Sequence, residues 1–222
     1  IDEDIVRDNE RLGFFVHELR NFIHTSMVAF ELVKSGNGDI RGLAGDVLHR
    51  SLLGARDLMS RSLAEVRLTR GIQDHEPFLV AAFIDELVSA ASLTADARGL
   101  TLTVGPVEGG VTVDVDRHLL AAVVMNVLEN AFKFTRPGTT VTLRVGVSAD
   151  RVVIDVQDEC GGLRGADLSG LFHPFAQRGA DRTGFGLGLA FSRWATEAMG
   201  GRISARNLPG VGCVFTVDLP RC

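Results

Sequence analysis

The sequence predicts a helical hairpin followed by an α+β domain, because two stretches of the chain follow different patterns of apolar residues. From residue 2 to residue 70 there is no proline, and apolar residues recur at three- and four-residue steps, as in amphipathic helices. Beyond Pro77, runs of alternating apolar and polar residues indicate strands interleaved with helices. We therefore expect two domains, at residues 1–72 and 73–222.

The first region is expected to form two long helices joined by a tight turn at Ser35–Asp39, whose residues favour turn and left-handed conformations. The apolar stripes consist of Leu12, Phe15, Val16, Leu19, Phe22, Ile23 and Phe30 in the first helix and of Leu48, Leu52, Ala55, Met59, Leu63 and Val66 in the second. A lone antiparallel pair of helices leaves much of each stripe uncovered. We therefore expect a homodimer in which two hairpins pack as a four-helix bundle.

The second region is expected to alternate helices and strands. The expected elements are a helix near 81–98, strands near 100–104 and 111–115, a helix near 117–134, strands near 140–147 and 151–157, a glycine-bearing loop to about 184, a helix near 187–199, and strands near 202–206 and 211–219. This order predicts an α+β domain with helices over one face of a sheet.

Composition argues against several classes of protein. The net charge of −5 and the lack of a Lys/Arg-rich block argue against nucleic acid as a ligand. Three widely spaced cysteines without CxxC spacing indicate a reducing, cytoplasmic compartment and argue against a disulfide framework or a zinc site. No apolar run approaches the ~20 residues that span a bilayer. The chain begins without Met and inside an expected helix, so we expect an upstream sensor part in a longer protein.

His17 is expected on the outer face of the first helix, about 160° from Leu19 at 100° per residue, and therefore in solvent. Glu18 follows it directly, and a carboxylate there can hold the second ring N–H and accept its proton as a general base. Asn21 lies one turn along on the same polar face. His24 also points outward but is followed by Thr25 rather than an acid, so it is the weaker candidate.

The string His17-Glu18-Leu19-Arg20-Asn21 resembles the phosphoacceptor box of histidine kinases. The resemblance implies that His17 is phosphorylated and that Asn21 orients a water that hydrolyses the phosphorylated partner, which would add a phosphatase activity. Phe22 stands where the family usually has proline, and this difference is expected to straighten the helix.

The segment Asn126–Thr135 is the first of four that resemble the ATP-binding domain shared by histidine kinases, gyrase-type ATPases, Hsp90 and MutL. Asn126 and Asn130 project from one helix face, where amide oxygens can reach a magnesium ion and a triphosphate. The resemblance implies that Asn130 is the Mg²⁺ ligand and that Asn126 and Lys133 face the phosphates of ATP. It also implies a Bergerat-type (GHKL) α+β sandwich.

The second segment, Asp158-Glu159-Cys160-Gly161-Gly162, follows an alternating apolar strand. The resemblance makes Asp158 the residue that reads the adenine amine. Gly162 matches the family's second glycine in this box, whereas Cys160 replaces the first, which bears on how closely the backbone can approach the base.

The third segment, Leu171–Phe175, resembles the family's phenylalanine box, in which Phe175 would pack the lid over nucleotide. The fourth segment places Gly184, Gly186, Gly188 and Leu189 at the start of a helix, where backbone N–H groups can cradle phosphates. Between them, Arg178 or Arg182 is a weak candidate for offsetting charge on the γ-phosphate.

Together these segments imply the catalytic core of a sensor histidine kinase that uses ATP and Mg²⁺ to phosphorylate His17 and then an aspartate on a response-regulator receiver domain. A GHKL-type ATPase is an alternative, in which Glu129 would activate water for hydrolysis. A second alternative is a degenerate kinase that keeps the bundle as a dimeric phosphotransfer or docking scaffold. Cys160 and Phe22 keep that alternative open.

Overall fold

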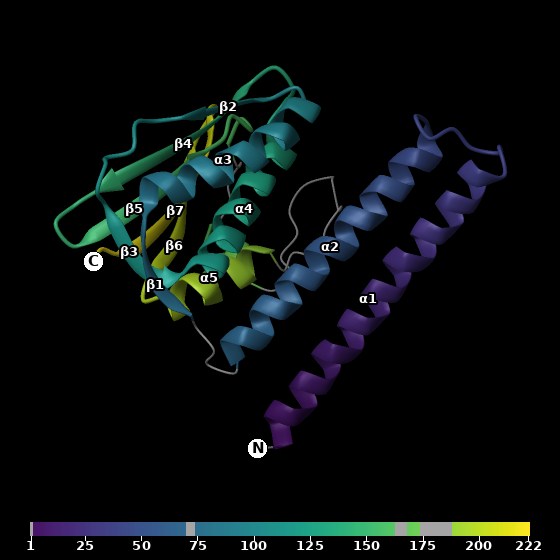
Figure 1. Cartoon of the computed structure of the whole chain (residues 1–222), viewed down its shortest axis with the longest axis horizontal. Helices are drawn as coiled ribbons and strands as arrows, with labels where there is room; N and C mark the ends of the chain where they lie inside the picture. The colour runs from purple at the N-terminus through teal and green to yellow at the C-terminus, as the bar shows by residue number, and fades with distance from the viewer. Residues whose placement is uncertain (1, 70–73, 163–167, 174–187) are drawn as a thin grey trace. The chain divides into compact units, whose positions relative to one another are not determined.

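The computed structural model describes residues 2–69, 74–162, 168–173 and 188–222. The chain divides into two compact units, residues 1–66 and 67–222, which are described separately (Figure 1). Within the described residues, no helix combines the length and the apolar character that crossing a membrane requires.

The first unit is a hairpin of two helices, α1 (Asp2–Lys34) and α2 (Leu43–Thr69). The turn between them begins at Gly36, whose φ of 74° is in the left-handed region that glycine adopts at low cost. Small side chains are buried along the hairpin, namely Ser26, Ala29, Ser51 and Ala55. The helices approach closely at Gly54, where the absence of a side chain leaves room for the ring of Phe22. A Cβ at this position would overlap that ring.

The apolar residues of the hairpin do not all face its interior. Ile23 and Phe30 of α1 and Leu52 and Met59 of α2, all expected in the packed stripes, are between 44% and 55% exposed. Met27, on the same side of α1 as Ile23, is 62% exposed. The hairpin therefore buries one face of each helix in itself and leaves a second apolar face uncovered.

The second unit is built on a five-stranded sheet with the strand order β2-β4-β5-β7-β6. Its strands are β2 (Thr101–Val104), β4 (Thr140–Val147), β5 (Arg151–Gln157), β6 (Arg202–Leu208) and β7 (Gly212–Pro220). The pair β2 and β4 is parallel, and the other neighbouring pairs are antiparallel. Alternate residues of β5, including Ile154, are buried, as the period of two in its sequence predicts.

Three helices lie on one side of this sheet (Figure 1). They are α3 (Val80–Ala97), α4 (Arg117–Phe134) and α5 (Gly188–Ala198). The core between the layers consists of side chains that are at most 2% exposed, including Ile84, Leu119, Leu120, Leu128, Phe132, Leu143, Ile154 and Leu219. The α+β sandwich predicted from the alternation of patterns is confirmed, with boundaries close to the expected ones.

One strand was not expected. β1 (His75–Leu79) pairs antiparallel with β3 (Thr112–Asp116) in a separate two-stranded sheet, whereas the sequence pattern predicted no strand before residue 100. The strand contains a proline and buries only Phe78, so it lacks the alternation that marks a strand. Its pairing depends on β3, far along the chain, and local sequence does not reveal such a partner.

Helix α4 begins at a buried cap. The Asp116 side chain is 1% exposed, and its Oδ1 accepts hydrogen bonds from the backbone N–H groups of His118 (2.9 Å) and Leu119 (3.0 Å). Its Oδ2 accepts a third from Asp74 N–H at 3.4 Å. These bonds satisfy amides that the first turn of a helix leaves without partners, and they join α4 to the start of the domain.

We expect Asp116→Ala to lower the free energy of unfolding by about 2 kcal/mol, because it removes an N-cap and leaves buried amides unsatisfied. Urea denaturation of the whole chain measures the loss. Asp114→Ala is the matched control, since Asp114 is on the same strand with an exposed side chain. Equal stability of the two variants would contradict the capping role.

Candidate functional site

His17 lies on α1 with its side chain exposed, as the helical periodicity predicted, and Asn21 contacts it from one turn along. Asn21 Nδ2 is 3.2 Å from His17 Nδ1. Positions i and i+4 are neighbours on a helix surface, so the helix itself places the amide beside the ring. The side chain of Glu18, the third residue expected here, lies outside the described residues.

The contact with Asn21 bears on which ring nitrogen of His17 can react. When the amide nitrogen donates to Nδ1, the proton of the neutral ring is on Nε2, which then has no lone pair to offer. When the amide is turned so that its oxygen accepts from Nδ1–H, the lone pair is on Nε2. The two amide orientations therefore correspond to an unreactive and a nucleophilic form of Nε2.

Asn126, Asn130 and Lys133 all lie on α4, but they differ in their surroundings. Asn126 is 6% exposed, and its Nδ2 donates to Ser192 Oγ of α5 at 2.8 Å. Its side chain occupies the space that a Cβ at Gly188 would need. Asn130 and Lys133 are half-buried. Asn126 thus joins α4 to the start of α5, and Asn130 and Lys133 remain the more accessible polar groups of this face.

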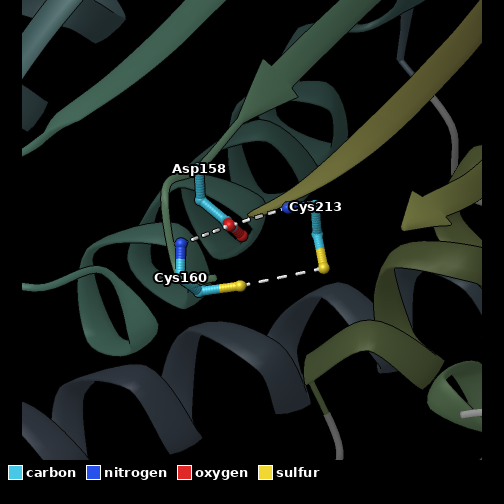
Figure 2. Close-up of side chains that lie close together, drawn as sticks. All are labelled: Asp158, Cys160 and Cys213. Carbon is cyan, nitrogen blue, oxygen red and sulfur yellow. Dashed lines mark hydrogen bonds between the residues drawn. The ribbon is translucent and has the colours of Figure 1, made fainter. Parts of the chain in front are cut away.

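Asp158 follows β5 and is held rigidly. Its side chain is 3% exposed, and Oδ1 accepts hydrogen bonds from Cys213 N–H (2.8 Å) and Cys160 N–H (3.1 Å) (Figure 2). Asp158 N–H in turn donates to the Cys213 carbonyl at 2.9 Å, which extends the pairing of β5 with β7 by one residue. Because both amides bind Oδ1, Oδ2 is the oxygen that they leave for a ligand.

Two glycines in the segments around Asp158 leave no space for a side chain. A Cβ at Gly212 would overlap the Asp158 backbone oxygen and come within 2.7 Å of Oδ1. Gly162 has φ of +79°, and a Cβ there would lie 2.9 Å from Asn207 Oδ1. Gly162 was expected from the sequence. Gly212 was expected only as part of a closing strand and Ser192 was not singled out, because a glycine at a strand start and a serine in a helix carry no local signal of their distant contacts.

Cys160 and Cys213 meet beside Asp158. Their sulfur atoms are 3.8 Å apart, and Cys213 is buried while Cys160 is half-buried. Burial raises the pKa of the Cys160 thiol, and a hydrogen bond with the Asp158 carboxylate raises it further. Cys160 is therefore held as a thiol next to the expected adenine-binding carboxylate.

The remaining candidates are only partly described. Phe175, Gly184, Gly186, Arg178 and Arg182 lie outside the described residues. Leu171 and Phe172 end a short 3₁₀ helix, η1 (Leu168–Phe172), which contacts α5 and β6. Gly188 and Leu189 form the first turn of α5, as expected for residues that open a helix.

We expect Gly212→Ala to destabilise the domain by roughly 1–3 kcal/mol, because the added methyl group forces Asp158 and its two amide partners apart. Thermal unfolding followed by circular dichroism measures the loss, and hydrogen exchange should accelerate at the amides of Cys160 and Cys213. Gly146→Ala is the control, since a Cβ there would make only ordinary contact with Val153. Unchanged exchange at both amides would contradict the assignment.

Comparison with known proteins identifies the second unit. Residues 115–222 match the family described as histidine kinase-, DNA gyrase B-, and HSP90-like ATPase. The alginate biosynthesis sensor protein KinB of Pseudomonas aeruginosa is 29% identical over 216 residues, covering 92% of this chain and 35% of that protein. The sensor protein KdpD of Mycobacterium tuberculosis is 34% identical over 171 residues, covering 73% of this chain and 19% of that protein.

A solved structure extends the likeness in fold to most of the chain. The histidine kinase AdeS of Acinetobacter baumannii superposes with a TM-score of 0.69 at 21% identity, covering 92% of this chain and 97% of that one. The chain spans only about a third of KinB and a fifth of KdpD. The chain belongs to the sensor histidine kinase family, and its second unit carries an ATPase domain of the GHKL type.

Proposed function

We propose that this chain is the catalytic core of a homodimeric sensor histidine kinase that transfers the γ-phosphoryl group of ATP to its own His17. The observation that carries the proposal is an exposed His17, contacted by Asn21, in a chain that also carries a GHKL ATPase domain. The helical part is residues 1–72 and the ATP-binding part is residues 73–222. Because ATP is an intracellular nucleotide, the core works in the cytoplasm.

The ATP-binding domain holds the nucleotide at the two polar clusters described above. Asp158 Oδ2 accepts a hydrogen bond from the adenine amine, and the two amides on Oδ1 keep the carboxylate oriented for it. Gly212 keeps the space around this carboxylate open, and Gly162 avoids a collision with Asn207. A buried, hydrogen-bonded acceptor suits the adenine amine. The cost of removing the carboxylate from water is already offset by its hydrogen bonds in the folded protein.

The phosphate end of the nucleotide lies toward α4 and the start of α5. Asn130 supplies an amide oxygen for Mg²⁺, Lys133 supplies a positive charge, and Asn126 fixes the distance between the two helices. Bound Mg²⁺ offsets charge on the β- and γ-phosphates. The family resemblance assigns the lid to Phe175 and the phosphate cradle to Gly184, Gly186, Gly188 and Leu189.

His17 reacts through Nε2 when Nδ1 carries the proton. As Nε2 attacks the γ-phosphorus, the N–P bond forms and the bond to the bridging oxygen breaks, which releases ADP. The ring is then cationic, and the Nδ1 proton passes to Glu18 as the general base. The phosphoryl group next moves to an aspartate of a response-regulator receiver domain, and Asn21 orients the water that later hydrolyses it.

The uncovered face of the hairpin supports the homodimer. Ile23, Met27 and Phe30 recur at steps of four and three residues on α1, about 90° from the face that buries Ser26 and Ala29. Apolar faces of this kind on both helices are typical of a four-helix bundle seen without its second half. A second copy of the hairpin would cover them.

We expect the chain to incorporate acid-labile label from γ-labelled ATP and Mg²⁺ on His17. His17→Gln should abolish the label because it removes the proposed acceptor, and Asn130→Asp should abolish it because the metal site is altered. His24→Gln is the matched control and should label like the parent. Chemical stability of the label and mass spectrometry of the phosphopeptide identify the acceptor.

The same experiment separates the alternatives. Label that persists in His17→Gln would show that the acceptor is wrong. A parent that binds and hydrolyses ATP without being labelled would favour an ATPase. A parent that does neither would favour the docking scaffold.

We expect Met27→Glu to weaken dimerisation by about two orders of magnitude or more, because burying an unpaired carboxylate costs several kcal/mol. Sedimentation equilibrium of the whole chain measures the dissociation constant. His24→Glu adds the same charge to the exposed polar face and should leave it unchanged. If both substitutions act alike, the Met27 face is not the dimer interface.

A further inference from the structure

Asp158, Cys160 and Cys213 form a cluster of three potential metal ligands (Figure 2). One carboxylate oxygen and two sulfur atoms lie within 4.8 Å of one another, and the two sulfur atoms point toward each other. Asp158 and Cys213 are buried and Cys160 is half-buried. The cysteines are 53 positions apart, so only the fold brings them together.

We propose that this cluster binds a thiophilic divalent cation such as Zn²⁺, and that the bound cation competes with adenine nucleotide for Asp158. The competition rests on the proposed function, whereas the cation site does not. This site is distinct from the proposed magnesium site at Asn130, because it consists of other residues. It also prefers other ions, since two thiolates and a carboxylate select Zn²⁺ or Cd²⁺ over Mg²⁺.

The spacing of the sulfur atoms fits such an ion. Two Zn–S bonds of about 2.3 Å that meet at the tetrahedral angle hold their sulfurs roughly 3.8 Å apart. The measured separation of Cys160 Sγ and Cys213 Sγ is 3.8 Å. The carboxylate oxygen then closes on the ion with a shift of about 1 Å or less, since ligands of tetrahedral zinc are roughly 3.3–3.8 Å apart. A water molecule or an outside ligand would take the fourth position.

The backbone around the cluster is already organised for binding. The amides of Cys160 and Cys213 share Asp158 Oδ1, so both main chains are held against the same carboxylate. Neither cysteine has to be brought in from a distance when an ion arrives. An ordered site of this kind loses little entropy on binding, which favours affinity.

A bound dication supplies the positive charge that two thiolates and a carboxylate lack. Binding releases the thiol protons to solvent, because the metal holds each sulfur as a thiolate.

Cadmium titration of the reduced chain tests the site directly, in the presence of a phosphine reductant that excludes disulfides. We expect thiolate–cadmium absorption that saturates at one Cd²⁺ per chain, is reversed by Zn²⁺ and is unaffected by excess Mg²⁺. Cys160→Ser and Cys213→Ser should each weaken Cd²⁺ binding by at least the roughly 10–100-fold that loss of an outer supporting group costs. Cys222→Ser is the matched control and should bind like the parent, since Cys222 is exposed and outside the cluster.

Absence of the absorption in the parent, or its persistence in Cys160→Ser, would overturn the proposal. Loss of the thiolate–cadmium absorption in Cys222→Ser would also overturn the proposal, because the site would then lie elsewhere or between chains. Circular dichroism of each serine variant shows that it is folded.

A second titration measures competition, with ADP in place of the cation as the varied ligand. We expect Zn²⁺ to weaken ADP binding at least tenfold in the parent and not in Cys160→Ser. If ADP fails to bind while Cd²⁺ binds, the proposed function fails and the cation site stands. If ADP binds equally with and without Zn²⁺ while Cd²⁺ is bound, the competition between cation and nucleotide is wrong.

Discussion

The proposed adenine-binding end of the second unit depends on one shared acceptor, Asp158 Oδ1, which binds two backbone amides from segments far apart in the chain. These two hydrogen bonds join the end of β5 to the start of β7. A buried carboxylate would otherwise carry a large desolvation cost, and charge-assisted hydrogen bonds offset it. The absence of a side chain at Gly212 is part of the same arrangement, since any Cβ there would displace the carboxylate.

A second hydrogen bond between distant elements lies at the other end of the proposed site. The Asn126 amide binds Ser192 and fills the space above Gly188, so it links α4 to the first turn of α5. In the proposed function this matters because phosphate binding needs backbone amides and side chains at set distances. Asn126 thus joins two helices, in addition to the ligand-facing role proposed for it.

The helical unit shows which features the periodicity of apolar residues can predict and which it cannot. The spacing of apolar residues predicted two helices, the turn between them, and the exposure of His17. It did not separate the stripe that packs within the hairpin from the stripe at Ile23, Met27 and Phe30 that remains uncovered. Hydrophobicity records only that a residue avoids water. Which surface covers it is decided by the approach of the helices, and here Phe22 against Gly54 and the small residues set that approach.

Sequence alone determined the two-part organisation, the order of helices and strands, and the family, because these depend on local periodicity and on short motifs such as His17–Asn21 and Asn126–Thr135. Tertiary structure decided the pairing of β1 with β3, the role of Gly212, and the meeting of Cys160 with Cys213. Cysteine spacing along the chain had argued against a metal site, since it shows no ligand pair. The reason is common to all three: contacts between residues far apart are made by the sheet register and helix packing, and neither is encoded in any single stretch of sequence.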